Sequence, residues 1–69
     1  MKLSARNMIK ATVKQITPGM VSSEIVLELP GGQEIVSVIT KNSAEALKLK
    51  PGKEVYAVIK ASNVIIAVD

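Results

Sequence analysis

Four turn signals divide the sequence into short stretches of similar length. They lie at Thr17-Pro18-Gly19, Pro30-Gly31-Gly32, Lys50-Pro51-Gly52 and Ser62-Asn63. Glycine, proline and clustered small polar residues interrupt regular structure and favour tight turns. The stretches between the turns are rich in valine and isoleucine, whose branched side chains favour strands over helices. This spacing predicts a small β protein whose strands follow one another closely along the chain.

Five strands and one helix are expected between these turns. The expected strands cover residues 8–16, 20–29, 34–40, 54–61 and 64–68. The segment 42–49 is different, because it contains good helix formers and ends just before Pro51-Gly52. Asn42, with Glu45 three residues later, is its candidate N-cap.

This order of elements indicates an all-β fold with one short helix between the third and fourth strands. It is typical of an OB-like Greek-key barrel, which has five strands and is partly open. An SH3-like barrel or a small sandwich is the alternative fold. The sequence contains no internal repeat, low-complexity tract or linker, so residues 1–69 are expected to form a single domain.

Two of the expected strands carry apolar side chains on both faces. Neighbouring residues of a strand point to opposite faces, so Ile35 and Ile39 lie opposite Val36 and Val38. The strand at 54–61 repeats the pattern, with one face carrying Val55, Ala57 and Ile59 and the other Tyr56 and Val58. A small barrel covers only its inner face, so the outer aliphatic surface is expected to form protein contacts.

The chain also needs stabilisation beyond its own core. A domain of 69 residues buries only about 60% of its unfolded surface. Domains of this size are usually held by disulfides, by a metal or by association with other chains. The sequence has no cysteine and no histidine, which excludes disulfides and the usual zinc sites. The sequence therefore predicts a homo-oligomer.

The residue types give little support for catalysis. Without histidine or cysteine, the chain lacks the usual nucleophiles and general bases. Glu24 and Glu28 are the only near carboxylate pair within one strand, and about 13 Å between them is too wide for a glycosidase pair. Pro30-Gly31-Gly32 precedes a strand, so it resembles a hairpin turn and not a phosphate loop. We therefore do not expect an enzyme.

Composition also limits the classes of partner. A net charge of +3 favours an anionic partner. Tyr56 is the only aromatic residue, so bases would have almost no platform for stacking and nucleic acid is not expected. The longest apolar run, residues 64–68, is far shorter than the roughly 18 residues that a spanning helix needs. The N-terminus also lacks the apolar region of a secretory signal, and we expect a cytoplasmic protein that does not bind membranes.

Hydrogen-bond donors without nearby carboxylates occur at three places in the sequence. They are Ser4 and Arg6 before the first strand, Thr40 and Ser43 at the start of the helix, and Lys60 at the end of the fourth strand. Taken singly, Thr40 and Ser43 are typical helix caps. The two cations are typical surface charges. Taken together, the five residues make a small anion the best remaining candidate ligand.

Five motifs together give the sequence a resemblance to a known family. They are Ser4-Ala5-Arg6-Asn7, Val21-Ser22-Ser23-Glu24-Ile25-Val26-Leu27, Ile39-Thr40-Lys41-Asn42-Ser43, Leu49-Lys50-Pro51-Gly52 and Val55-Tyr56-Ala57-Val58-Ile59-Lys60-Ala61-Ser62. In order and spacing, over nearly the whole chain, they resemble the molbindins, small molybdenum-pterin-binding proteins built from a single Mop domain. The resemblance implies an OB-like subunit, a homohexamer arranged as a trimer of dimers, and storage of molybdate or tungstate.

The resemblance also implies which residues hold the oxyanion. It places the site on six positions, the last two from a neighbouring subunit: Ser4, Arg6, Lys60, the backbone at Ala61, Thr40 and Ser43. A tetrahedral oxyanion without protons offers only acceptors, so a site made of donors alone suits it. The family's second kind of site, near threefold axes, cannot be placed on residues of this sequence. Two other interpretations stay open, namely an association module without ligand and an OB-type nucleic-acid binder.

Overall fold

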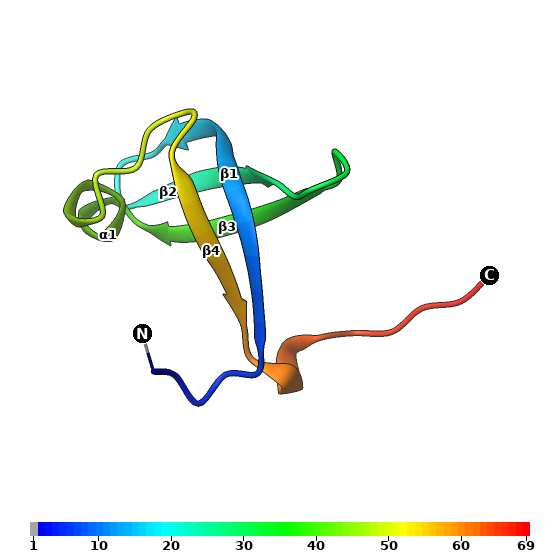
Figure 1. Ribbon diagram of the computed structural model, residues 1–69. Coiled ribbons are helices and arrows are strands. Elements are labelled where there is room, and N and C mark those ends of the chain that lie inside the picture. Colours follow the sequence, from blue (N-terminus) through cyan, green and yellow to red (C-terminus); the bar gives the residue numbers. More distant parts are fainter. Residues whose placement is uncertain (1) are drawn as a thin grey trace.

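A single curled antiparallel sheet forms most of the computed structural model, which describes residues 2–69. The strands are β1 (Asn7–Pro18), β2 (Ser22–Glu28), β3 (Glu34–Thr40) and β4 (Glu54–Ile59). Their order in the sheet is β3-β2-β1-β4. One short helix, α1 (Lys41–Ala46), follows β3, and a 3-10 turn, η1 (Ala61–Asn63), follows β4 (Figure 1).

The long first strand gives the sheet its curl. The first half of β1 pairs with β4, from Asn7 opposite Ile59 to Thr12 opposite Glu54. Its second half pairs with β2, and the register shifts between Val13 and Gln15. A bulge of this kind bends a strand and increases its local twist. The sheet therefore curls into a half-barrel, in which β3 and β4 form the two free edges (Figure 1).

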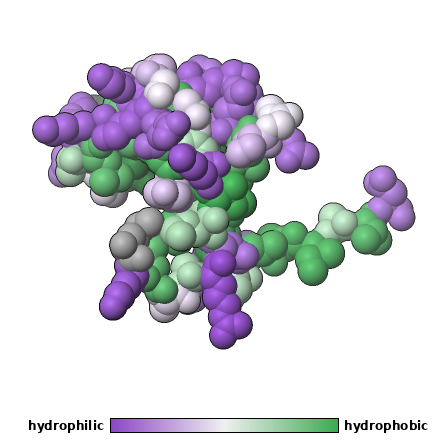
Figure 2. Space-filling model, viewed as in Figure 1, coloured by the Kyte–Doolittle hydropathy of each residue, from purple (hydrophilic) through white to green (hydrophobic). Residues whose placement is uncertain are grey.

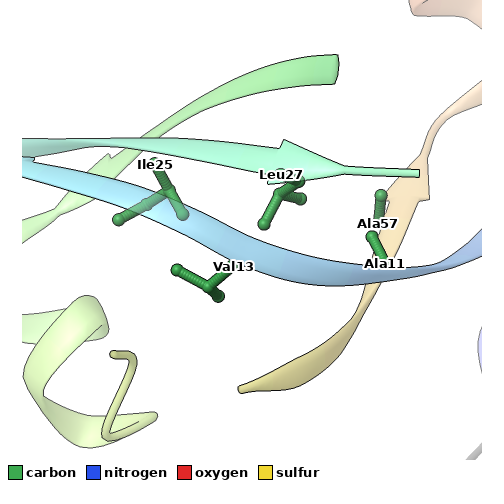
Figure 3. Close-up of a cluster of buried hydrophobic side chains, with 5 residues drawn as sticks. All are labelled: Ala11, Val13, Ile25, Leu27 and Ala57. Atoms are coloured by element: carbon green, nitrogen blue, oxygen red, sulfur yellow. The ribbon is translucent and has the colours of Figure 1, made fainter. Parts of the chain in front are cut away.

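The core lies on the concave side of the half-barrel and is small. Five apolar residues from three strands are buried there (Figure 3): Ala11, Val13, Ile25, Leu27 and Ala57. Val13 and Ile25 are the largest fully buried side chains, with 1% and 2% of their surfaces exposed. Partly buried residues around them include Ile39 from β3 and Leu49 from the loop after α1. So few buried side chains leave the single subunit with a modest hydrophobic core.

The N-cap of the short helix lies two residues earlier than the sequence pattern indicates. Thr40, and not Asn42, is its N-cap, because the Thr40 hydroxyl accepts a hydrogen bond from the backbone N–H of Ser43 at 3.0 Å. The predicted cap at Asn42 is therefore wrong. Thr40 ends β3 in extended conformation, which is the backbone geometry that an N-cap requires.

The fifth strand expected at residues 64–68 is absent from the sheet. Residues 64–69, called here the C-terminal arm, form no strand within the described chain, and they extend away from the sheet (Figure 1). Two of its apolar residues are almost fully exposed, Ile65 at 92% and Val68 at 91%. The residues have the composition of a strand, but a strand needs a partner, and here they pair with neither free edge of the sheet. The structure is thus a four-stranded half-barrel, and the prediction of a five-stranded barrel is wrong for the single subunit.

The outer faces of the edge strands confirm the prediction of apolar residues on both sides of β3 and β4. The exposed apolar residues there are Val36, Val38, Tyr56 and Val58. Figure 2 shows the C-terminal arm as a hydrophobic projection from the body. No helix among residues 2–69 has both the length and the apolar character needed to cross a membrane.

The turn between β1 and β2 gives a prediction about stability. The backbone N–H of Gly19 donates to the Ser22 carbonyl at 2.8 Å, and a Cβ at Gly19 would lie only 2.7 Å from that same oxygen. We expect Gly19→Ala to lower the free energy of unfolding by about 1–3 kcal/mol, because the backbone must shift to relieve the clash. Urea unfolding followed by circular dichroism measures the loss.

An alanine substitution in the loop between β2 and β3 is the control for Gly19→Ala. Gln33 is exposed in the loop between β2 and β3, and Gln33→Ala should stay within about 0.5 kcal/mol of the parent protein. Equal unfolding midpoints for the two variants would contradict the clash at Gly19.

Candidate functional site

A shallow concavity lies where the N-terminal segment meets the end of β4. It is lined by Ser4, Ala5, Arg6, Val58, Lys60, Ala61 and Ser62. The pairing of β1 with β4 explains this arrangement, because Asn7 lies opposite Ile59. The residues just before Asn7 and just after Ile59 therefore leave the sheet side by side. Four of the six site residues predicted from the sequence, Ser4, Arg6, Lys60 and Ala61, come together here.

The polar side chains of the concavity are donors without an accompanying carboxylate. Arg6 and Lys60 supply two cations, and Ser4 and Ser62 supply two hydroxyls. Neither Arg6 nor Lys60 takes part in an ion pair among residues 2–69. The other lining residues are Ala and Val, which carry no charge. This set of groups suits an anion that offers acceptors only.

The backbone of η1 adds to this donor set. The turn is closed by the N–H of Asn63, which donates to the Lys60 carbonyl at 2.9 Å, and by that of Val64, which donates to the Ala61 carbonyl at 3.3 Å. The first N–H groups of a helical turn have no partner within the turn. The N–H groups of Ala61 and Ser62 are therefore not used in closing η1, and both residues are exposed.

The other two predicted residues lie at the opposite end of the sheet. Thr40 pairs with Ser22 at the end of β3, next to the turn that follows Pro18. This is the far end of β1 from Asn7, roughly 35 Å away along the curved course of a 12-residue strand. The Thr40 hydroxyl donates to the Ser43 hydroxyl at 2.8 Å. Within one subunit, Thr40 and Ser43 are cap residues and do not reach the concavity.

The structure adds Ser62 to the candidate site. In the sequence this residue belongs to a turn signal and ends one of the five family motifs, but it is not among the predicted site residues, although it stands two positions after Lys60. In a tight turn the residues that follow a functional lysine stay close to it, and this proximity is the signal that could have identified Ser62. Among residues 2–69 no three acidic side chains cluster in a way that could hold a metal cation.

Comparison with known proteins shows similarity to proteins named for molybdenum-pterin binding. The TOBE domain family matches residues 3–66. The molybdenum-pterin-binding protein 3 of Clostridium pasteurianum is 44% identical over 66 residues, which cover 96% of this chain and 97% of that protein. A probable molybdenum-pterin-binding protein of Haemophilus influenzae is 38% identical over 69 residues, the full length of both chains.

Solved structures show the same similarity in three dimensions. A molybdate binding protein from Sporomusa ovata superposes with a TM-score of 0.93 at 41% identity, and the match covers 99% of this chain and 100% of that one. The cytoplasmic molybdate-binding protein ModG, solved with molybdate bound, superposes with a TM-score of 0.91 at 54% identity. That match covers 94% of this chain and 46% of ModG.

Proposed function

The chain belongs to the TOBE domain family and, within it, to the molybdenum-pterin-binding proteins or molbindins, and from this premise we propose that it binds and stores molybdate or tungstate as an oxyanion. The donor-only concavity formed by residues 4–6 and 60–62 is the observation that carries the proposal. Relatives and structural neighbours named for molybdenum or molybdate binding support it.

In this proposal the two cations dominate affinity and the hydroxyls set the fit. Charge-assisted hydrogen bonds contribute about 1.5–3 kcal/mol each, so Arg6 and Lys60 should provide most of the binding energy. The hydroxyl of Ser4 and the backbone N–H of Ala61 complete the contacts. Phosphate keeps a proton at neutral pH and needs an acceptor for it, and the residues lining the concavity include no carboxylate.

We propose further that Thr40 and Ser43 reach the oxyanion from a neighbouring subunit. One chain holds them at the far end of the sheet from Arg6 and Lys60, so a single subunit presents two separate partial sites. Packing of two copies can join one partial site of each. This arrangement requires a homo-oligomer, and the molbindin family suggests a hexamer built as a trimer of dimers, with residues 1–69 as one Mop domain.

We propose that the protein acts in the cytoplasm as a binding protein and not as an enzyme. The relatives' names describe binding proteins, and the neighbour ModG is described as cytoplasmic. We do not extend the proposal to a pterin. Tyr56 is the only aromatic residue of the sequence, and it does not line the concavity that holds Arg6 and Lys60.

Titration calorimetry with molybdate, tungstate, sulfate and phosphate tests the proposed function, together with the mass of the assembly in solution. We expect molybdate and tungstate to bind at least about tenfold more tightly than sulfate or phosphate, a difference of roughly 1.4 kcal/mol. An assembly without oxyanion affinity would contradict the proposal and favour a pure association module. Single-stranded DNA binding that weakens steeply with salt would favour the nucleic-acid interpretation instead.

A further inference from the structure

The net positive charge of the chain is concentrated in one segment. Residues 41–53, which form α1 and the loop after it, contain four lysines and one glutamate. This segment therefore carries a net charge of +3, the value for the whole chain, while the remaining residues hold five cations and five carboxylates. Figure 2 shows hydrophilic residues over the part of the body where Figure 1 places α1 and this loop. A local excess of one charge attracts partners of the opposite charge.

Three of these lysines form a compact feature of the surface. Lys48, Lys50 and Lys53 line one shallow hollow together with Pro51 and Gly52. We call this surface the lysine patch. None of its lysines takes part in an ion pair among residues 2–69, and no carboxylate lines the hollow. The patch therefore presents positive charge that the fold itself does not neutralise.

Hydrogen bonds hold the loop that carries the lysine patch. The backbone N–H of Gly52 donates to the Val13 carbonyl at 2.8 Å, and that of Val13 donates to the Lys53 carbonyl at 2.9 Å. These two bonds fasten the loop to β1. The Lys53 ammonium also donates to the Leu47 carbonyl at 2.5 Å, just after the end of α1. A loop fixed in this way loses little further freedom when it binds a partner.

The backbone of Lys48 gives an independent reason to assign its side chain to a partner. Lys48 has a φ of +54°, and it is the only residue other than glycine with a positive φ among residues 2–69. It follows the C-cap Leu47, at a position where glycine is usual because it has no Cβ. A cation at a helix end stabilises the helix dipole, but the Lys53 ammonium already lies against the Leu47 carbonyl. The Lys48 side chain is therefore free for a role outside the fold.

The neighbouring cations of β1 limit the extent of the unpaired charge. Lys10 pairs with Glu54 at 3.6 Å. Lys14 pairs with Glu34 and, at 4.0 Å, with Glu28. Unpaired positive charge thus does not continue from the lysine patch onto this strand. A single-stranded nucleic acid is bound by a long basic groove with aromatic side chains for stacking, and the patch has no aromatic residue. A short acidic peptide segment suits the patch better.

We propose that the lysine patch docks an acidic segment of another protein. The ammonium groups of Lys48 and Lys50 pair with carboxylates of that segment, while Lys53 keeps the loop in position. Lys53 precedes the first residue of β4 and Lys60 follows its last residue, so roughly 20 Å separates the patch from the oxyanion concavity. The two surfaces share no residue. One subunit can therefore hold an oxyanion and an acidic partner together, and the docking surface is independent of the proposed function.

Fluorescence anisotropy of a labelled hexaglutamate peptide, at low ionic strength and with the full chain, tests the docking. We expect the double variant Lys48→Gln/Lys50→Gln to bind this peptide about 5- to 30-fold more weakly, because two exposed ion pairs are lost. Lys2→Gln/Lys10→Gln is the matched control, since it has the same net charge and both positions lie outside the patch. Its affinity should fall less than about threefold, because only long-range charge is removed. Equal losses in the two variants would overturn the proposal, as would a parent protein that does not bind the peptide.

Lys48→Gly separates a role in partner binding from a role in the fold. Glycine adopts a positive φ without steric conflict, so urea unfolding should show a midpoint no lower than that of the parent protein. The variant should nevertheless bind hexaglutamate about 2- to 5-fold more weakly, because one ammonium group is lost. Unchanged affinity for the peptide, or a lower midpoint, would overturn the assignment of Lys48 to the partner.

Amide chemical shifts of the isotope-labelled protein show where the peptide binds. Hexaglutamate should shift amides within residues 48–53 and leave those of residues 4–6 and 60–62 unchanged. Shifts confined to residues 4–6 and 60–62 would contradict the docking, because the peptide would then occupy the oxyanion concavity. A labelled oligothymidylate that binds through the same lysines more tightly than hexaglutamate would also contradict it, in favour of a nucleic acid.

Discussion

Replacing Arg6 with alanine is expected to weaken molybdate binding by roughly 10- to 150-fold, which corresponds to one charge-assisted hydrogen bond of about 1.5–3 kcal/mol. Arg6 lines the concavity with Lys60, and neither cation has an acidic partner among residues 2–69. Arg6→Ala therefore removes a charge that is available to the ligand and breaks no ion pair of the fold. Titration calorimetry measures the loss.

Two further variants make the Arg6 experiment specific. Lys2→Ala removes an exposed cation that does not line the concavity. Only a long-range charge is lost in this variant, so its affinity for molybdate should stay within about threefold of the parent protein's. Arg6→Lys keeps the charge and loses the planar pair of donors, so it should bind with intermediate affinity. Unchanged affinity in Arg6→Ala, or equal losses in Arg6→Ala and Lys2→Ala, would contradict the site.

The candidate site was only partly predictable from the sequence. Arg6 and Lys60 are separated by most of the chain, and the register that places Asn7 opposite Ile59 brings their segments together. In the sequence both residues are recognisable as donors without nearby carboxylates, but their positions along the chain do not reveal that register. The sequence predicts two roles for Thr40 and Ser43, as helix caps or as ligands. The structure shows them as caps, and their role as ligands stays a prediction that needs a second subunit.

The strands were predictable because the alternation of side chains is local. The expected third strand, residues 34–40, agrees with β3. The expected second strand began too early, because Met20 and Val21 are apolar residues in a turn, where they are 96% and 76% exposed. Apolar residues usually indicate a strand interior. Their exposure here gives the outer surface more of the apolar area that an assembly could cover.

The fifth strand shows the limit of local patterns. Residues 64–68 have strand composition, which predicts a fifth strand of the barrel. A strand forms only when an edge offers hydrogen-bonding partners, and partner choice depends on the direction in which the chain leaves η1. That direction is set by the hydrogen bonds of Asn63 and Val64 to the carbonyls of Lys60 and Ala61. Such geometry is not encoded in the alternation of apolar residues.

The largest expected effect on stability comes from the core, where Ile25→Ala should lower the free energy of unfolding by about 2–5 kcal/mol. Ile25 is only 2% exposed and belongs to the small cluster shown in Figure 3. A domain of 69 residues has a total stability of about 3–10 kcal/mol at typical values per residue. The variant is therefore expected to be close to unfolding at room temperature.

Ile25→Val provides the graded comparison, because it removes one methylene and should cost about 0.5–1.5 kcal/mol. Urea unfolding followed by circular dichroism, at one fixed protein concentration, measures both variants. Molybdate at 100 times its Kd should restore about 2.7 kcal/mol to each, since a ligand that binds only the folded state stabilises it by mass action. A loss below about 1 kcal/mol in Ile25→Ala would contradict the core, and the absence of any restoration would contradict binding of molybdate to the folded chain.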